Sequence, residues 1–210
     1  MKFHEEVLNK AQKKVLGRLG PLMKEKGFYL GGGTAIALYL GHRRSKDFDW
    51  FTASPFKDPL KLAQTFKEEG ISLKVTQVAR GTLDGIISGV GVSFFEYRYP
   101  LLKTTTRWPE MNTSLASLPD LACMKLSAIV QRGSKKDFID IFALEEKKFP
   151  LKKMLSYYQK KFGLKDIGNI LYALSYFDDA DKERMPNMLW KTDWNTIKRT
   201  VKDRLKDEMN

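Results

Sequence analysis

Hydrophobic and polar positions alternate with two different periods along this chain, and the pattern changes near residue 119. The first segment, residues 5 to 26, spaces its apolar residues as one face of a helix does, and Gly27 ends that pattern. Residues 28 to 99 contain short apolar runs separated by glycine, which is typical of strands. From Pro119 onward the spacing is helical throughout. We therefore predict a mixed N-terminal half and an all-helical C-terminal half.

Within the N-terminal half, the pattern predicts a strand at "FYL", a glycine turn, and a helix at "TAIALYL" that Thr34 starts by capping. "DFDWF" reads as a second strand, and "PLKLAQTFKEEG" as an amphipathic helix. Three β-rich runs follow, over 71–79, 81–90 and 91–99, and predict a meander or hairpin.

The predicted fold class is α+β, a short mixed sheet flanked by helices and followed by a helical bundle. We divide the chain into a core at 1–118, which includes the N-terminal helix, and a helical domain at 119–210 that closes a cleft over the core.

The charge and composition of the chain limit the kinds of molecule and metal ion that it can bind. The 210 residues carry 37 Lys and Arg against 25 Asp and Glu, a net charge of +12, which favours binding to nucleic acid or nucleotides. A single cysteine and two histidines leave a zinc site short of ligands, so a metal here would need oxygen ligands. No run of 18 apolar residues and no signal-peptide core is present, so we expect a cytoplasmic protein without a membrane partner.

Two carboxylates and a glycine turn suggest the chemistry. In a strand, Asp47 and Asp49 project from one face roughly 6 to 7 Å apart, so they can bind the same ions. Carboxylates suit Mg²⁺ or Mn²⁺, and two such ions can support transfer of a phosphoryl or nucleotidyl group. The turn at Gly31, Gly32 and Gly33 lets backbone N–H groups approach a phosphate at a helix N-terminus. Together these features predict a nucleoside triphosphate site.

These residues resemble those of the DNA polymerase β-like nucleotidyltransferases, which carry Gly-Gly or Gly-Ser, a spacer, and then Asp, a hydrophobic residue, and Asp or Glu. Here Gly32 and Gly33 precede the spacer 34–46 and Asp47-Phe48-Asp49. "GGTAIALYLGHRRSKDFDWF" and the later "KLSAIVQRGSKKDFIDIFAL" look like the two signatures of the AbiEii/AbiGii toxin family. The resemblance covers roughly residues 28 to 145.

A third carboxylate is expected on a neighbouring strand, to complete the metal site or to accept the proton of the attacking hydroxyl. Glu96 is the candidate, because it is the only acid in "VGVSFFEYRY"; the alternative is a surface partner for Arg98. Asp84 ranks second, since its neighbour Gly85 suggests a turn.

The resemblance also implies residues that bind the triphosphate. Lys125 and Arg132 can point from one helix face, and Asp140 would support a basic residue. Arg43 and Lys46 read partly as a solvated face, although one arginine of this run should face the nucleotide. The nucleotide- and phosphate-binding set that we predict is Gly32, Gly33, Thr34, Arg44, Ser45, Lys125, Lys136 and Asp137. The structural alternative for each charged member is a helix cap, a salt bridge or a solvated surface.

The sequence contains neither G-x-x-x-x-G-K-[ST] nor G-x-G-x-x-G. These are the phosphate-binding turns of P-loop proteins, kinases and Rossmann folds, so the sequence does not support any of these classes. The predicted function is transfer of a nucleoside monophosphate from a nucleoside triphosphate, with two Mg²⁺ or Mn²⁺ ions, to a hydroxyl of tRNA or another RNA. By resemblance the protein would be the toxin of a toxin–antitoxin or phage-defence pair, with a cognate antitoxin as partner. Two rivals stay open: an inactive nucleotide- or RNA-binding module, and a transferase acting on protein or a small molecule.

Basic side chains of the C-terminal half are the candidates for an RNA-binding platform, and the alternative for them is an ordinary solvated face. They are Lys152, Lys153, Lys160, Lys161, Lys198, Arg199 and Lys202.

Overall fold

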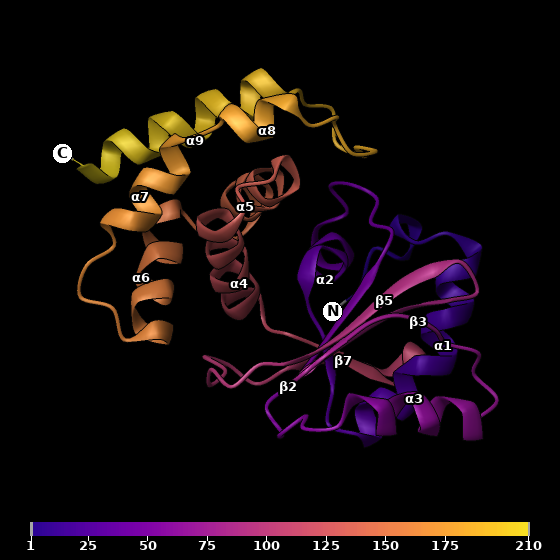
Figure 1. Ribbon diagram of the computed structural model, residues 1–210. Coiled ribbons are helices and arrows are strands. Elements are labelled where there is room, and N and C mark those ends of the chain that lie inside the picture. The colour runs from indigo at the N-terminus through magenta and orange to yellow at the C-terminus, as the bar shows by residue number, and fades with distance from the viewer. Residues whose placement is uncertain (1, 210) are drawn as a thin grey trace.

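The computed structural model describes residues 2–209 and shows a mixed sheet with helices on both faces and a helical C-terminal region (Figure 1). This confirms the predicted α+β class. The N-terminal elements are α1 (Lys10–Glu25), β1 (Tyr29–Leu30), α2 (Gly32–Leu40), β2 (Phe48–Thr52), α3 (Pro59–Glu68), β3 (Lys74–Ala79), β4 (Thr82–Ile87) and β5 (Val90–Glu96). Two short strands follow, β6 (Thr106–Trp108) and β7 (Thr113–Leu115). The helical region contains α4 (Leu118–Gln131), α5 (Lys135–Lys147), α6 (Leu151–Phe162), α7 (Gly168–Ser175), α8 (Asp178–Lys182) and α9 (Trp194–Met209).

The sheet has the order β3-β4-β5-β2-β1-β7-β6. The predicted meander is correct, because β3, β4 and β5 pair antiparallel in sequence. β2 pairs parallel to β5 and antiparallel to β1, which in turn lies parallel to β7. The sequence pattern did not reveal β6 and β7, which are three residues each and too short to show an alternation.

The two faces of the sheet differ in polarity. Phe48, Trp50 and Phe94 are fully buried on one face, where the Phe94 ring packs against Phe66 of α3. Residues at the alternate positions, Asp49 among them, point to the other face. That second face is covered by α2, with α4 and α5 packed beyond it, as the upper part of Figure 1 shows. The polar residues of β2 therefore face the helices that carry the second sequence motif.

The start of α2 differs from the prediction. The helix begins at Gly32 with Gly31 as its N-cap residue, whereas the cap was expected at Thr34. The Thr34 hydroxyl is instead hydrogen-bonded to the backbone carbonyl of Asp47 and to the hydroxyl of Ser45, 2.7 Å away. Thr34 thus ties the first turn of α2 to the approach of β2.

The segment between α8 and α9 returns to the N-terminal half, where it meets the loop before β2 (Figure 1). The Arg44 N–H donates to the Asn187 carbonyl at 2.8 Å, and the Leu189 N–H donates to the His42 carbonyl at 2.9 Å. Arg43 and Met188 form an isolated antiparallel bridge. The C-terminal region is therefore hydrogen-bonded to the loop that leads into Asp47. Within residues 2–209, no helix is long and apolar enough to span a lipid bilayer.

Candidate active site

The glycine turn and Asp49 are in direct contact. Gly32 has a φ of +62°, a backbone conformation that favours glycine. A Cβ at this position would also collide with the carboxylate of Asp49. The Asp49 carboxylate therefore rests against the backbone at the N-terminus of α2, where the helix dipole favours negative charge. Glycine is therefore needed at position 32 for two reasons: the positive φ angle and the close approach of the Asp49 carboxylate.

Asp47 lies immediately before β2, exposed, and packs over β5. A Cβ added at Gly91 would stand 2.5 Å from Asp47 Oδ1, so a glycine on β5 leaves the room that this carboxylate occupies. Asp47 and Asp49 are two residues apart and project from the same face of the sheet, as the sequence predicted. Burial and the Asp47 carboxylate raise the pKa of Asp49, while Lys125 opposes that rise. A cation between the two acids would relieve their repulsion.

The structure does not bring Glu96 to this pair. The parallel register aligns Asp49 with Ser93 and Thr52 with Glu96, an odd number of residues apart, so Glu96 lies on the opposite face from Asp49. Its carboxylate accepts the Phe56 N–H at 2.8 Å and pairs with the guanidinium of Arg98. The prediction of Glu96 as the third carboxylate is therefore wrong, and its alternative role as a partner for Arg98 is correct.

Asp84, the second-ranked acid, lies on the correct face. It sits within β4 rather than in a turn, and the register aligns it with Ser93, which is aligned in turn with Asp49. Asp84 is half-buried one strand farther out than Ser93. Across residues 2–209, no three His, Cys, Asp or Glu side chains gather closely enough to hold a metal ion.

Lys125 is buried in a charge cluster with the acids of α5. Its ammonium lies 2.8 Å from Asp137 Oδ1 and 2.8 Å from Asp140 Oδ2. Burial alone would lower the pKa of Lys125, but Asp140 and Asp137 outweigh it and raise that pKa. Lys125 is thus held as a cation between α4 and α5, and its positive charge acts on Asp49.

Asp137 is shared between Lys125 and the end of α4. Arg132 donates to both of its oxygens, from Nε at 2.9 Å and from Nη2 at 3.0 Å. The Ser134 hydroxyl donates to Oδ2 at 2.9 Å. Asp137 is fully buried with these partners, so it orients Lys125 and Arg132 instead of touching a ligand itself. Both basic residues do point from one face of α4, as their spacing predicted.

Asp140 forms the inner end of the same cluster. It accepts from Arg43 Nε at 2.7 Å and Nη2 at 2.8 Å, and it contacts His42 Nε2 at 2.8 Å. Although burial raises the pKa of Asp140, Arg43 and Lys125 hold it well below its ordinary value. Burial lowers the pKa of His42 and outweighs the opposing effect of Asp140, which favours the neutral ring. The expectation that Asp140 supports a basic residue is confirmed, and its partners are Arg43 and Lys125.

The two arginines before β2 differ in burial and in partner. Arg43 is buried against Asp140, whereas the side chain of Arg44 is exposed. A Cβ at Gly33 would collide with the Arg43 guanidinium, so Gly33 faces this arginine. Ser45 contacts Thr34, and Lys136 is exposed at the start of α5. The alternation of buried and exposed residues in "GHRRSKD" is irregular, so nothing in that stretch identified His42 and Arg43 as the buried pair.

The residues present fit a divalent cation that also binds a substrate. Mg²⁺ in proteins commonly takes one or two carboxylates, with phosphate oxygens and water filling its other positions. Two carboxylates are available, Asp47 beside the backbone of Gly91 and Asp49 beside the backbone of Gly32. No third carboxylate of the described residues joins them, so the protein ligands expected for two ions are incomplete. Lys125, Arg132 and Lys136 add positive charge around Asp49.

Comparison with solved structures shows that the fold is that of nucleotidyltransferases. A provisionally assigned nucleotidyltransferase from H. pylori aligns with a TM-score of 0.58 at 14% identity, over 97% of this chain and 99% of that one. MenT4, the nucleotidyltransferase toxin Rv2826c from Mycobacterium tuberculosis H37Rv, aligns with a TM-score of 0.52 at 11% identity, over 93% of this chain and 82% of that one.

A sequence relative defines the family. Uncharacterized protein aq_aa25 of Aquifex aeolicus (strain VF5) is 36% identical over 208 residues, which is 95% of this chain and 98% of that protein. The chain belongs to the same family as aq_aa25. No protein-family model matches the chain.

Proposed function

We propose that the protein is a metal-dependent nucleotidyltransferase that moves a nucleoside monophosphate from a nucleoside triphosphate to a hydroxyl of an RNA acceptor. The observation that carries the proposal is the contact between the Asp49 carboxylate and the Gly32 backbone at the start of α2. It joins a carboxylate pair to a helix N-terminus, the two halves of a site for a metal-bound triphosphate. The nucleotidyltransferase fold supports the same conclusion.

In this proposal, the turn at Gly32 and Gly33 and the first turn of α2 receive the β- and γ-phosphates through backbone N–H groups. Mg²⁺ or Mn²⁺, held by Asp47 and Asp49, would neutralise charge on the triphosphate and align it with the acceptor. A bond forms between the acceptor oxygen and the α-phosphorus, and the bond from that phosphorus to the leaving pyrophosphate breaks. Lys125 and Arg132, oriented by Asp137, stabilise the departing negative charge.

Asp84 is the acid that we assign to the acceptor. It shares the sheet face of Asp49 and is separated from it by Ser93. A carboxylate at this place can orient the attacking hydroxyl or accept its proton, the role that the sequence pattern suggested for Glu96.

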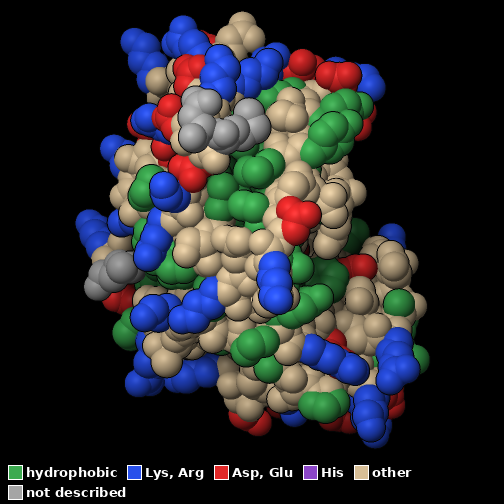
Figure 2. Space-filling view, turned by 90° about the vertical axis from the view of Figure 1, so that its left-hand side faces the viewer, with side chains coloured by type: hydrophobic (Ala, Val, Ile, Leu, Met, Phe, Trp, Pro, Cys, Tyr) green, Lys and Arg blue, Asp and Glu red, His purple; other side chains and the backbone are tan. Residues whose placement is uncertain are grey.

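RNA is the preferred acceptor because the chain carries a net charge of +12. Lys and Arg side chains are spread over the face shown in Figure 2 and are most frequent toward its edges, with hydrophobic side chains and some Asp and Glu between them. The resemblance of both motifs to the AbiEii/AbiGii family supports a role as the toxin of a toxin–antitoxin or phage-defence pair, held in check by an antitoxin in the cytoplasm. The fold neighbour MenT4 is itself a toxin. A protein or small-molecule acceptor is the enzymatic alternative.

One observation favours a second candidate function. Ser93 occupies the position beside Asp49 on β5, so the strand next to Asp49 offers no carboxylate there, although a third carboxylate was expected on a neighbouring strand. A nucleotide- or RNA-binding module without turnover would tolerate that serine.

A labelling experiment tests the proposal. The protein is incubated with each α-³²P-labelled nucleoside triphosphate, Mg²⁺ and a cell extract, and RNA, protein and small molecules are then separated. We expect label in RNA with wild-type protein and none with Asp49→Asn. Label found only in protein or only in small molecules would show that the acceptor is not RNA but a member of the labelled class. Tight binding of nucleotide without transfer to any fraction would favour the binding module.

A further inference from the structure

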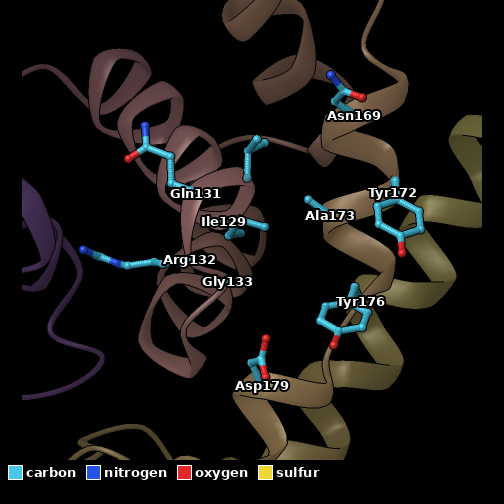
Figure 3. Close-up of a pocket in the computed structure, with 10 residues that line it drawn as sticks. Ile129, Gln131, Arg132, Gly133, Asn169, Tyr172, Ala173, Tyr176 and Asp179 are labelled. Atoms are coloured by element: carbon cyan, nitrogen blue, oxygen red, sulfur yellow. The ribbon is translucent and has the colours of Figure 1, made fainter.

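A pocket outside the carboxylate site opens between the end of α4 and helices α7 and α8 (Figure 3). Its volume is about 350 Å³, at the lower end of the range of about 300–1,000 Å³ common for small-molecule sites. Its lining includes Ile129, Arg132, Asn169, Tyr172, Ala173 and Tyr176. Of these residues, Arg132 also belongs to the charge cluster of the candidate active site.

Two tyrosines of this pocket expose their rings. Tyr172 is 72% exposed and Tyr176 is 43% exposed, one helical turn apart at the end of α7. Their rings are nearly parallel, with an interplanar angle of 15° and centroids 6.5 Å apart. Large aromatic rings left in water, rimmed by polar groups, are typical of recognition surfaces. Parallel exposed rings offer flat faces on which another planar group can stack.

The remaining lining matches the shape and polarity of a nucleobase. Ile129 and Ala173 supply an apolar floor, while the amides of Gln131 and Asn169 are at the rim. A base has two apolar faces and a polar edge, so it needs both kinds of surface. Asp179 is the acidic residue that lines the pocket, and Lys182 Nζ lies 3.1 Å from Asp179 Oδ1, where it offsets the negative charge. The pocket therefore does not repel an anionic ligand strongly.

Arg132 connects this pocket to the candidate active site. It lines the pocket and also donates two hydrogen bonds to Asp137. In Figure 3 its side chain extends from α4 away from the tyrosines, toward the N-terminal half of the molecule. Its side chain is still largely exposed, at 63%, and its charge reaches Asp49. A nucleotide whose base lay in the pocket would bring its phosphate toward Arg132.

We propose that the pocket between α4 and α7 binds a nucleobase by stacking on Tyr172 and Tyr176. This inference rests on the proposed function, because it assigns the pocket to a nucleotide of that reaction. Two sources share the chemistry: the base of the nucleoside triphosphate and a base at the reacting end of the acceptor RNA.

Photocrosslinking tests the proposal. The probes are 5-iodouridine and 8-azidoadenosine, each used as a triphosphate and as the 3′-terminal residue of a short RNA, and crosslinked peptides are mapped by mass spectrometry. We expect crosslinks at Tyr172 or Tyr176; the form of probe that gives them identifies the source of the base.

Substitutions supply the binding readout. Tyr172→Ala and Tyr176→Ala should each weaken binding of the crosslinking probe about fivefold or more, because base–aromatic stacking is removed. Tyr172→Phe and Tyr176→Phe should keep it, since stacking needs no hydroxyl. Tyr99→Ala, which removes another exposed tyrosine remote from this pocket, is the control and should have no effect.

The outcomes separate this inference from the proposed function. Crosslinks that map to residues near Gly32 and Lys125 but never to α7, with unchanged binding by both alanine variants, overturn the pocket and leave the transferase standing. Crosslinks at α7 without any transfer of label sustain the pocket and contradict the transferase. Probes that crosslink nowhere, or alanine variants that impair only the binding of a protein partner, overturn the nucleobase assignment.

Discussion

At the scale of single residues, the site depends most on the glycine that touches Asp49. Gly32→Ala introduces a Cβ into the Asp49 carboxylate and also strains a positive φ. We expect the variant to bind nucleotide at least about tenfold more weakly, because the carboxylate must move from the start of α2. Isothermal titration with a nucleoside triphosphate and Mg²⁺ measures the effect.

Gly27→Ala is the matched control for that substitution. Gly27 has a φ of +75° and no atom within 4 Å of an added Cβ, so it shares the backbone strain of about 1–2 kcal/mol without the collision. Both variants should unfold at a lower urea concentration, but only Gly32→Ala should bind the nucleotide more weakly. Equal nucleotide affinity in the two variants would contradict the assignment of the turn.

Lys125 is predicted to stabilise the folded protein through its two buried ion pairs. Lys125→Met removes a buried cation from Asp137 and Asp140, and we expect the free energy of unfolding to fall by about 3 kcal/mol. Lys136→Met, at an exposed position beside the same site, should change it by less than about 0.5 kcal/mol. Urea denaturation of both variants measures the difference. A stable Lys125→Met variant would mean that the cluster holds together through Arg43 and Arg132 alone.

Sequence reasoning located the residues of the site better than their contacts. Asp47, Asp49 and the glycines could be found because a strand and a turn place neighbours in sequence side by side. The burial of Asp137 by Arg132 and Ser134 depends on how α4 meets α5, and the burial of Arg43 depends on its contact with Asp140. Those contacts join residues from different elements, and a pattern read along one element contains no information on them.

At the scale of elements, the pairing of β2 with β5 decides which acid can serve the site. The alternation of each strand was visible in the sequence, but the register between two parallel strands was not. A shift of one residue exchanges the two faces, so the sequence alone did not show that Glu96 lies on the face opposite Asp49. β6 and β7 were missed because three residues do not establish a period.

Two substitutions test this register. Asp84→Asn should reduce transfer of labelled nucleotide by about a hundredfold or more if its carboxylate serves the acceptor hydroxyl. Glu96→Gln should leave the rate of transfer within about twofold, since its carboxylate is engaged by Phe56 and Arg98 on the other face. Steady-state rates with the same acceptor measure both. A rate that collapses with Glu96→Gln and survives Asp84→Asn would refute the assignment.

At the scale of the whole molecule, the predicted RNA platform needs one correction. Lys161 is buried and lies 2.7 Å from Asp120 Oδ1, so it belongs to the interior instead of the surface. The same ammonium donates to the Pro100 carbonyl at 2.8 Å and so ties α6 to the chain after β5. Lys198 is paired with Asp181 at 2.8 Å. The remaining members of the set are at least partly exposed: Lys152, Lys153, Lys160, Arg199 and Lys202.

A charge reversal should therefore avoid Lys161. Lys152→Glu combined with Lys160→Glu changes two exposed positions of α6, and we expect weaker RNA binding with nucleotide affinity unchanged. The slope of log affinity against log salt should become shallower by about 0.7 for each RNA phosphate that the variant no longer neutralises. Fluorescence anisotropy with a labelled RNA at several salt concentrations measures both quantities. An unchanged slope would exclude α6 from the acceptor surface.

The overall architecture followed from the sequence because strand patterns are confined to the N-terminal half, where they alternate with helices, and the C-terminal half has helical spacing throughout. The return of the segment after α8 to the loop at His42 and Arg44 did not, since its hydrogen bonds to that loop are made by the backbone, which any sequence can supply. The nucleobase pocket also depends on how α4 and α7 lie together.

The central claim is nucleotidyl transfer at Asp47 and Asp49, and the fate of the two ends of the triphosphate tests it most directly. Purified protein, Mg²⁺ and RNA are incubated in parallel with α-³²P- and γ-³²P-labelled samples of the same nucleotide. We predict that α-label enters RNA while γ-label is released as pyrophosphate, and that Asp49→Asn abolishes both. Transfer of γ-label to the acceptor, or α-label transfer that survives Asp49→Asn, would contradict the account.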